Sequence, residues 1–137
     1  MTDAVDIPFG FETIPQLLKK SVERFGDSHA IEDGDTTLTF ASLADKVEVA
    51  TRAVMAAGVQ RGDRCAIWAP NVWERVVAAL GIHHAGGVLV PINTRFKGEE
   101  AAYVLEKSRA RMLFTVQGFL GNDYVALLRG ARGEAHA

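Results

Sequence analysis

The fold is indicated by residues 58–71, which run GVQRGDRCAIWAPN. Gly58 ends a helical pattern, and after a short turn residues 64–69 form a continuous apolar run that predicts a buried strand. Asn71, with Glu74 three residues later, predicts the start of the next helix. A helix, a buried strand and another helix in this order are typical of a βαβ crossover, which places strands side by side in a parallel sheet.

The same alternation continues on both sides of this stretch. Apolar spacing predicts helices between Thr13 and Gly26, between Thr39 and Gly58, between Asn71 and Gly86, and over 98–108 and 121–129. Strands are predicted over 29–33, 36–40, 64–69, 88–92 and 112–116, the first two as a hairpin. We therefore expect an α/β fold of alternating helices and mainly parallel strands, with an arm over 1–12, a domain over 13–129 and a frayed tail over 130–137.

Composition narrows the class of protein. The 137 residues fit one domain, and 48% hydrophobic with 23% charged residues is an ordinary globular balance. The net charge of −2 argues against nucleic acid or a polybasic membrane anchor as the partner. One cysteine, Cys65, excludes an internal disulfide and a cysteine-based zinc site. With an acidic N-terminus and no apolar run long enough to span a membrane, we expect a cytoplasmic protein.

Most residues that often carry chemistry have a structural interpretation here. The sequence contains no dinucleotide-binding, Walker or nucleophile-elbow motif. His83 and His84 are adjacent on a helix and cannot chelate one metal, so His83 is expected to be a hydrogen-bonded core residue. Cys65 is expected to be an inert buried thiol. Trp68 and Trp73 suit core packing, with a ligand cleft as the alternative.

Two segments follow predicted strands directly, where open parallel sheets gather their ligands. In the first, residues 93–95, Arg95 is either a solvated turn residue or a phosphate contact. In the second, Asn71 either caps the following helix or meets an anion at its N-terminus.

Four stretches in order resemble the acyl-CoA synthetases, within the adenylate-forming superfamily. Residues 38–43 resemble the family's T-Y-x-E-L, with Ser42 in place of Glu, which weakens a capping box. Residues 58–71 resemble its G-V-x-x-G-D-R-V-A-I-x-x-x-N, followed by a matching Glu74. Residues 85–93 are similar to its A-G-x-x-x-x-P-x-N, and Glu100, Leu105 and Ser108 fit its next helix. The resemblance covers about residues 13–128. Residues 82–86, with residues 93–96 after them, look most similar to the bacterial ligases that feed β-oxidation, and within those they resemble the steroid-catabolic type that acts on a propanoate side chain.

The resemblance implies an activity and a fold. Members activate a carboxylic acid with ATP and Mg²⁺ to an acyl adenylate, which coenzyme A converts to the thioester. The fold implied is a partial N-terminal subdomain of the adenylate-forming large domain. Arg95 matches the family's arginine in N-x-R after the P-x-N strand, which in some coenzyme A ligases contacts coenzyme A phosphates.

The family's phosphate loop ending in Pro-Lys-Gly does not occur, and its Mg²⁺-binding Glu, ribose-binding Asp and carboxylate-contacting Lys fall beyond residue 137 in family order. We therefore expect no catalytic residue or metal ligand in this chain, and no acyl adenylate made by the chain alone. Its expected partner is the remainder of a ligase chain or a homologous ligase, with self-association through exposed apolar faces. The alternatives are a non-catalytic module that pairs with a full-length ligase, and a small flavodoxin-like nucleotide binder.

Overall fold

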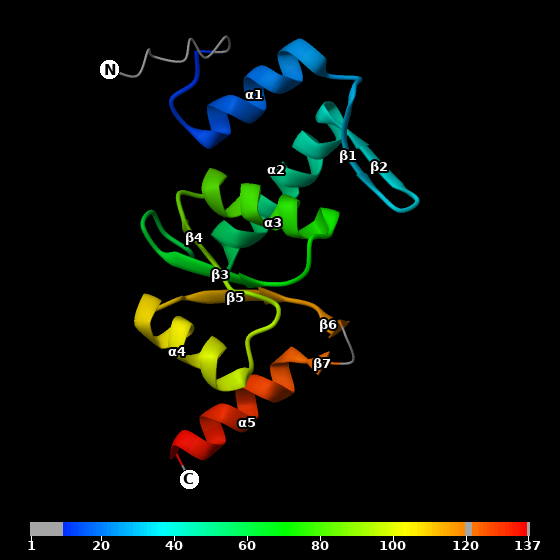
Figure 1. Ribbon diagram of the computed structural model, residues 1–137. Coiled ribbons are helices and arrows are strands. Elements are labelled where there is room, and N and C mark those ends of the chain that lie inside the picture. The colour runs from blue at the N-terminus through cyan, green and yellow to red at the C-terminus, as the bar shows by residue number, and fades with distance from the viewer. Residues whose placement is uncertain (1–9, 120–121, 137) are drawn as a thin grey trace, which may run out of the picture.

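A computed structural model describes residues 10–119 and 122–136 of the chain. Helices and strands alternate along most of it (Figure 1). The helices are α1 (Ile14–Phe25), α2 (Phe40–Ala56), α3 (Trp73–His84), α4 (Gly98–Ser108) and α5 (Tyr124–His136). The strands are β1 (His29–Asp33), β2 (Thr36–Thr39), β3 (Arg64–Trp68), β4 (Val88–Pro91), β5 (Met112–Thr115), β6 (Gln117–Phe119) and β7 (Asn122–Asp123).

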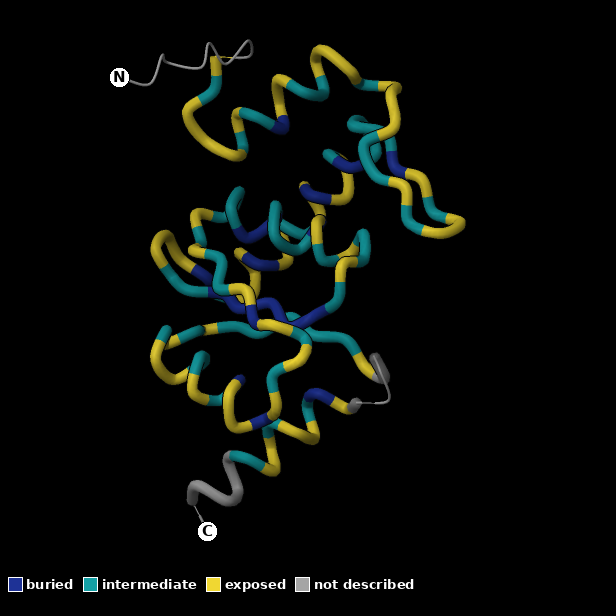
Figure 2. The backbone as a smooth tube through the Cα atoms, in the orientation of Figure 1, coloured by how far each residue is buried: buried dark blue, intermediate teal, exposed yellow. Residues whose placement is uncertain are grey.

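A parallel sheet in the order β4-β3-β5 lies at the centre. The central strand β3 is buried on both faces, because its side chains alternate between two cores. Cys65 and Ile67 face the helices α2 and α3, whereas Ala66 and Trp68 face α4 and α5. Figures 1 and 2 show these two helix pairs on opposite sides of the sheet, with the buried strand between them. The expected α/β architecture is confirmed.

Helices α2 and α3 pack unusually closely. A Cβ atom added at Gly81 would lie 2.8 Å from the Cβ atom of Ala50, so only glycine allows this approach. Beyond this helix pair, α1 and the antiparallel hairpin β1–β2 form a separate small core around Leu18, Leu38 and Val47. The hairpin turns at Gly34, whose φ of 55° favours glycine.

Local capping determines where the first two helices begin. Thr13 and Gln16 form the expected capping box. At α2, the Ser42 N–H donates to Thr39 Oγ1 (3.1 Å) and the Thr39 N–H donates to Ser42 Oγ (2.8 Å). Ser42 therefore forms the box in place of the family's Glu, and the expectation that it weakens this box does not match the bonds observed.

Three boundaries differ from the predicted ones. Helix α3 begins at Trp73 with Val72 as its N-cap residue, so Asn71 does not cap it. The last helix begins at Tyr124 and ends at His136, whereas a helix over 121–129 and a frayed tail were expected. The short antiparallel pair β6–β7 was not predicted, because strands this short carry no periodic signal. None of the described helices is long and apolar enough to cross a membrane.

Candidate functional site

The carboxyl edge of the sheet carries a cavity of about 390 Å³. Strand β3 ends at Trp68 and the parallel strand β4 ends at Pro91, so the segments that follow both strands leave the sheet at the same edge. The cavity is lined by residues 69–71 after β3, by residues 91–94 from β4 and its loop, and by Arg75 from the first turn of α3. The two segments selected from the sequence therefore lie beside one cavity.

The loop after β4 is held in place by the core beneath it. The Trp68 Nε1–H donates to the Asn93 carbonyl (3.0 Å), and the Tyr124 hydroxyl donates to the Thr94 carbonyl (3.1 Å). The Trp68 and Tyr124 rings are fully buried with their centroids 4.3 Å apart. Trp68 is thus a core residue, as expected, and it also positions the loop beside the cavity without lining the cavity itself.

Arg95 is positioned by its backbone. The Asn93 Oδ1 accepts a hydrogen bond from the Arg95 N–H (2.9 Å), which closes a tight turn directly after the cavity-lining residues. The Arg95 side chain is exposed, and no described carboxylate lies within ion-pair distance of it. Its guanidinium is therefore available to an anion that reaches the edge of the sheet.

Asn71 has a different role from either one expected. Its Oδ1 accepts a hydrogen bond from Arg75 Nη1 (2.5 Å). The N-terminus of α3 is occupied instead by the Asp33 carboxylate, which accepts from the Trp73 N–H (3.0 Å). Asp33 comes from the end of β1, and a negative group at this position is favoured by the helix dipole. The anion that meets this helix is part of the chain itself.

The remaining candidates stay outside this edge. His83 is half-buried beside another cavity of about 520 Å³, and its imidazole ring makes no hydrogen bond to a described residue, contrary to expectation. His84 Nδ1 contacts the Leu80 carbonyl at 2.7 Å. Trp73 packs against the core around α1 and α2, with the Lys46 ammonium 5.0 Å from its ring centroid.

Cys65 is a buried free thiol in the middle of the sheet. Burial raises the pKa of this thiol above its ordinary value, and the negative charge of Asp63 adds to the effect. The thiolate, which is the reactive form, is thereby disfavoured. This environment matches the inert role expected for Cys65.

Groups that could hold a metal ion do not come together in the part of the chain described. No three His, Cys, Asp or Glu side chains there form a metal-binding cluster. The cavity lining contains no carboxylate side chain, which is the protein ligand that usually holds Mg²⁺, so this lining does not suit the ion. The cavity instead offers a guanidinium and two amides, which are donors suited to phosphate or carboxylate oxygens.

The chain is similar to known proteins in both its sequence and its fold. Residues 18–136 match the family described as AMP-binding enzyme. The 3-[(3aS,4S,7aS)-7a-methyl-1,5-dioxo-octahydro-1H-inden-4-yl]propanoyl:CoA ligase of Rhodococcus jostii is 45% identical over 117 residues, which is 85% of this chain and 23% of the ligase. The ligase of the same name from Mycobacterium tuberculosis is 43% identical over 83% of this chain and 22% of its own length.

The fold has solved relatives as well. The crystal structure of the anthranilate CoA ligase AuaEII, in complex with anthranoyl-AMP, matches with a TM-score of 0.80 and 26% identity, covering 96% of this chain and 24% of that one. The chain spans less than a quarter of the length of the two curated relatives described above.

Proposed function

Because the chain belongs to the AMP-binding enzyme family, we propose that it forms the N-terminal part of the large domain of an acyl-CoA ligase. Such a ligase activates a carboxylic acid with ATP to an acyl adenylate and then forms the coenzyme A thioester. The observation that carries this proposal is the 45% identity to the Rhodococcus jostii propanoyl:CoA ligase over nearly the whole described fold. The free thiol of Cys65 fits the reducing, cytoplasmic location that we propose with it.

We further propose a steroid-derived propanoate as the acyl substrate, in preference to a fatty acid. The support is that the two relatives described above, which are 45% and 43% identical to this chain, are named as ligases of the same bicyclic propanoate. A relative named medium-chain acyl-CoA ligase is 32% identical over a similar length.

Within this proposal, the chain contributes a coenzyme A contact and a scaffold. Arg95 binds a phosphate of coenzyme A, because a guanidinium with no carboxylate partner among the described residues follows directly on the cavity-lining turn. Adenylation needs positive charge around the α-phosphate as pyrophosphate leaves. The described residues hold no Mg²⁺-binding cluster and the sequence holds no phosphate loop, so the chain alone makes no acyl adenylate.

A chimera tests the proposed function. Residues 18–136 replace the matching segment of the Rhodococcus jostii ligase, and thioester formation is measured with that ligase's own propanoate and with a medium-chain fatty acid. We expect a soluble chimera that prefers the propanoate, with kcat/KM within about tenfold of the parent, or about 1.4 kcal/mol.

The isolated chain is the matched control. It is expected to show no ATP–pyrophosphate exchange with either acid. A folded chimera without ligase activity contradicts the ligase assignment, and exchange by the isolated chain contradicts the proposed division of roles.

A further inference from the structure

The cavity at the carboxyl edge is lined by one arginine, Arg75, whose charge is not neutralised by a described carboxylate. Arg75 lines this cavity from the first turn of α3, opposite the loop that follows β4. Its Nη1 donates to the Asn71 Oδ1 at 2.5 Å, and an amide carries no charge. No described carboxylate lies within 4.0 Å of the Arg75 guanidinium.

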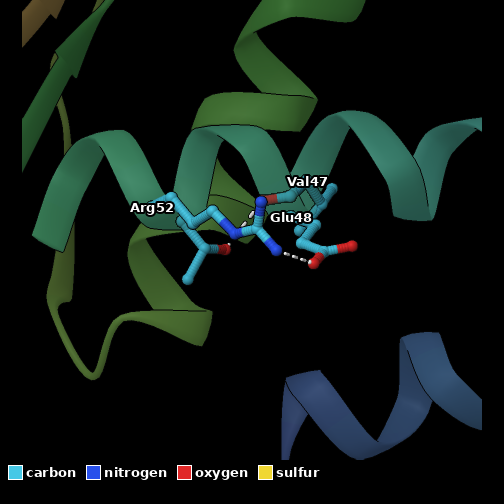
Figure 3. Close-up of polar contacts among 4 residues, drawn as sticks. Val47, Glu48 and Arg52 are labelled. Atoms are coloured by element: carbon cyan, nitrogen blue, oxygen red, sulfur yellow. Dashed lines mark hydrogen bonds and ion pairs between the residues drawn. The ribbon is translucent and has the colours of Figure 1, made fainter.

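Arg52 on α2 shows the contrasting arrangement (Figure 3). Its Nη2 lies 2.6 Å from the Glu48 carboxylate one helical turn away, so that cation already has an anionic partner. The two arginines therefore differ in what they can bind. Arg52 is paired within its own helix, whereas Arg75 is oriented by a neutral group and retains its charge beside a cavity.

The polar side chains that line this cavity together with Arg75 offer hydrogen-bond donors. The Asn71 Oδ1 is used by Arg75 and the Asn93 Oδ1 is used by the Arg95 N–H, so each side chain keeps its NH₂ group for another partner. No Asp or Glu is among the residues that line the cavity. On its other side, Arg75 borders the cavity of about 520 Å³, which Glu32 and Asp33 also line. The N-terminus of α3 does not contribute, because Asp33 occupies it.

We propose that Arg75, with the amide NH₂ groups of Asn71 and Asn93, forms a subsite for a phosphate group. A guanidinium already held by one hydrogen bond presents its remaining N–H groups to phosphate oxygens with little further loss of side-chain entropy. The subsite rests on the proposed function for the identity of the molecule that carries the phosphate. It assigns a binding role to the segment after β3, in addition to Arg95 after β4.

The test uses inorganic pyrophosphate as the probe and the chain itself as the protein. Amide resonances of the ¹⁵N-labelled chain are followed during a pyrophosphate titration. We expect resonances of residues 70–75 and 92–95 to shift. Arg75→Gln can still donate to Asn71 but carries no charge, so we expect it to raise the Kd for pyrophosphate at least tenfold. The matched variant Arg52→Gln is expected to leave this Kd unchanged.

A second variant guards against a folding defect in the first. Asn71→Asp has nearly the same shape and places a carboxylate next to Arg75, so it is expected to abolish the titration while Arg75 is still present. Equal titration of the wild type and Arg75→Gln overturns the subsite, as does the absence of any shift in the lining residues.

Coenzyme A and ATP then identify the source of the phosphate. If one of them binds the wild type and binds Arg75→Gln more weakly, the subsite is supported and assigned to that molecule. If both bind the wild type and Arg75→Gln equally well, the subsite is overturned. If the chimera is active but the chain does not bind pyrophosphate, the subsite proposal is contradicted and the ligase proposal stands. Pyrophosphate titration together with a folded, inactive chimera removes the ligase assignment and leaves the subsite standing.

Discussion

At the scale of single residues, position relative to the sheet separates the arginines that we propose as phosphate contacts from the buried thiol. Arg95 and Arg75 follow the carboxyl ends of β4 and β3, whereas Cys65 lies within β3 and is fully buried. The arginines keep their charge at the edge of the molecule. The thiol is held in its neutral form by the surrounding core.

Arg95→Ala in the active chimera is expected to raise KM for coenzyme A about tenfold with little change in kcat. The reason is that removing this exposed cation costs about 1.4 kcal/mol of phosphate binding. Steady-state kinetics with varied coenzyme A measures this effect. Arg61→Ala is the control, since Arg61 precedes β3 and lies at the opposite end of the sheet. An unchanged KM for coenzyme A in the Arg95 variant would show that this arginine is only a solvated turn residue.

The raised pKa of the Cys65 thiol predicts how stability depends on pH. In the unfolded chain the thiol ionises above about pH 8.5, whereas in the folded chain it stays protonated to higher pH. The unfolded state then binds fewer protons, so the free energy of unfolding falls as pH rises above that value. Urea denaturation between pH 7 and pH 10 measures this fall. It is expected to be smaller in Cys65→Ala, and equal slopes for both proteins contradict the pKa shift.

At the scale of elements, two kinds of capping appear. Helices α1 and α2 are capped by Thr13 and Thr39, which immediately precede them. Helix α3 has no side-chain cap of its own and receives the carboxylate of Asp33 from the hairpin. This bond joins the hairpin to the helix that carries Arg75, so the hairpin contributes to the geometry of the candidate site.

Asp33→Ala is expected to lower the free energy of unfolding by about 1 kcal/mol, the usual cost of a lost N-cap. Asp35→Ala is the control, because Asp35 is exposed in the same hairpin turn. Thermal and urea denaturation of both variants measure the change in the free energy of unfolding. If the Asp33 and Asp35 variants lose the same stability, the Asp33–Trp73 hydrogen bond adds no stability beyond the effect of replacing any aspartate in this turn.

At the scale of the whole molecule, the sheet keeps two outer strands. Both β4 and β5 pair with β3 on one side, and neither pairs with another described strand on the other. Val88 on β4, Tyr103 on α4 and Leu127 on α5 are large apolar side chains that are exposed. Unpaired strand edges next to exposed apolar groups favour association with further chain, whether the rest of a ligase or a second copy.

The isolated chain is therefore expected to self-associate. Sedimentation velocity at increasing concentration should show a rising average mass. Val88→Lys, which places a charge on the outer strand β4, should reduce it, whereas Val49→Lys on the exposed face of α2 should not. A monomer at every concentration, with a cooperative thermal transition, would contradict this expectation.

The sequence by itself determined the architecture and most helix starts. Apolar periodicity and capping act over a few residues, so α4 and the two threonine caps could be predicted from local sequence. The continuous apolar run of β3 also predicted a strand covered on both faces, which the structure confirms. Arg95 was found because it directly follows a predicted strand.

Only the tertiary structure decided how the site is assembled. The Trp68–Asn93, Tyr124–Thr94 and Asp33–Trp73 hydrogen bonds join residues 25, 30 and 40 positions apart. Such bonds depend on how the helices pack on the sheet, and no local pattern encodes them. Arg75 and Asn71 were separated from the 93–95 loop in the sequence, and the parallel pairing of β3 with β4 brings them to one cavity.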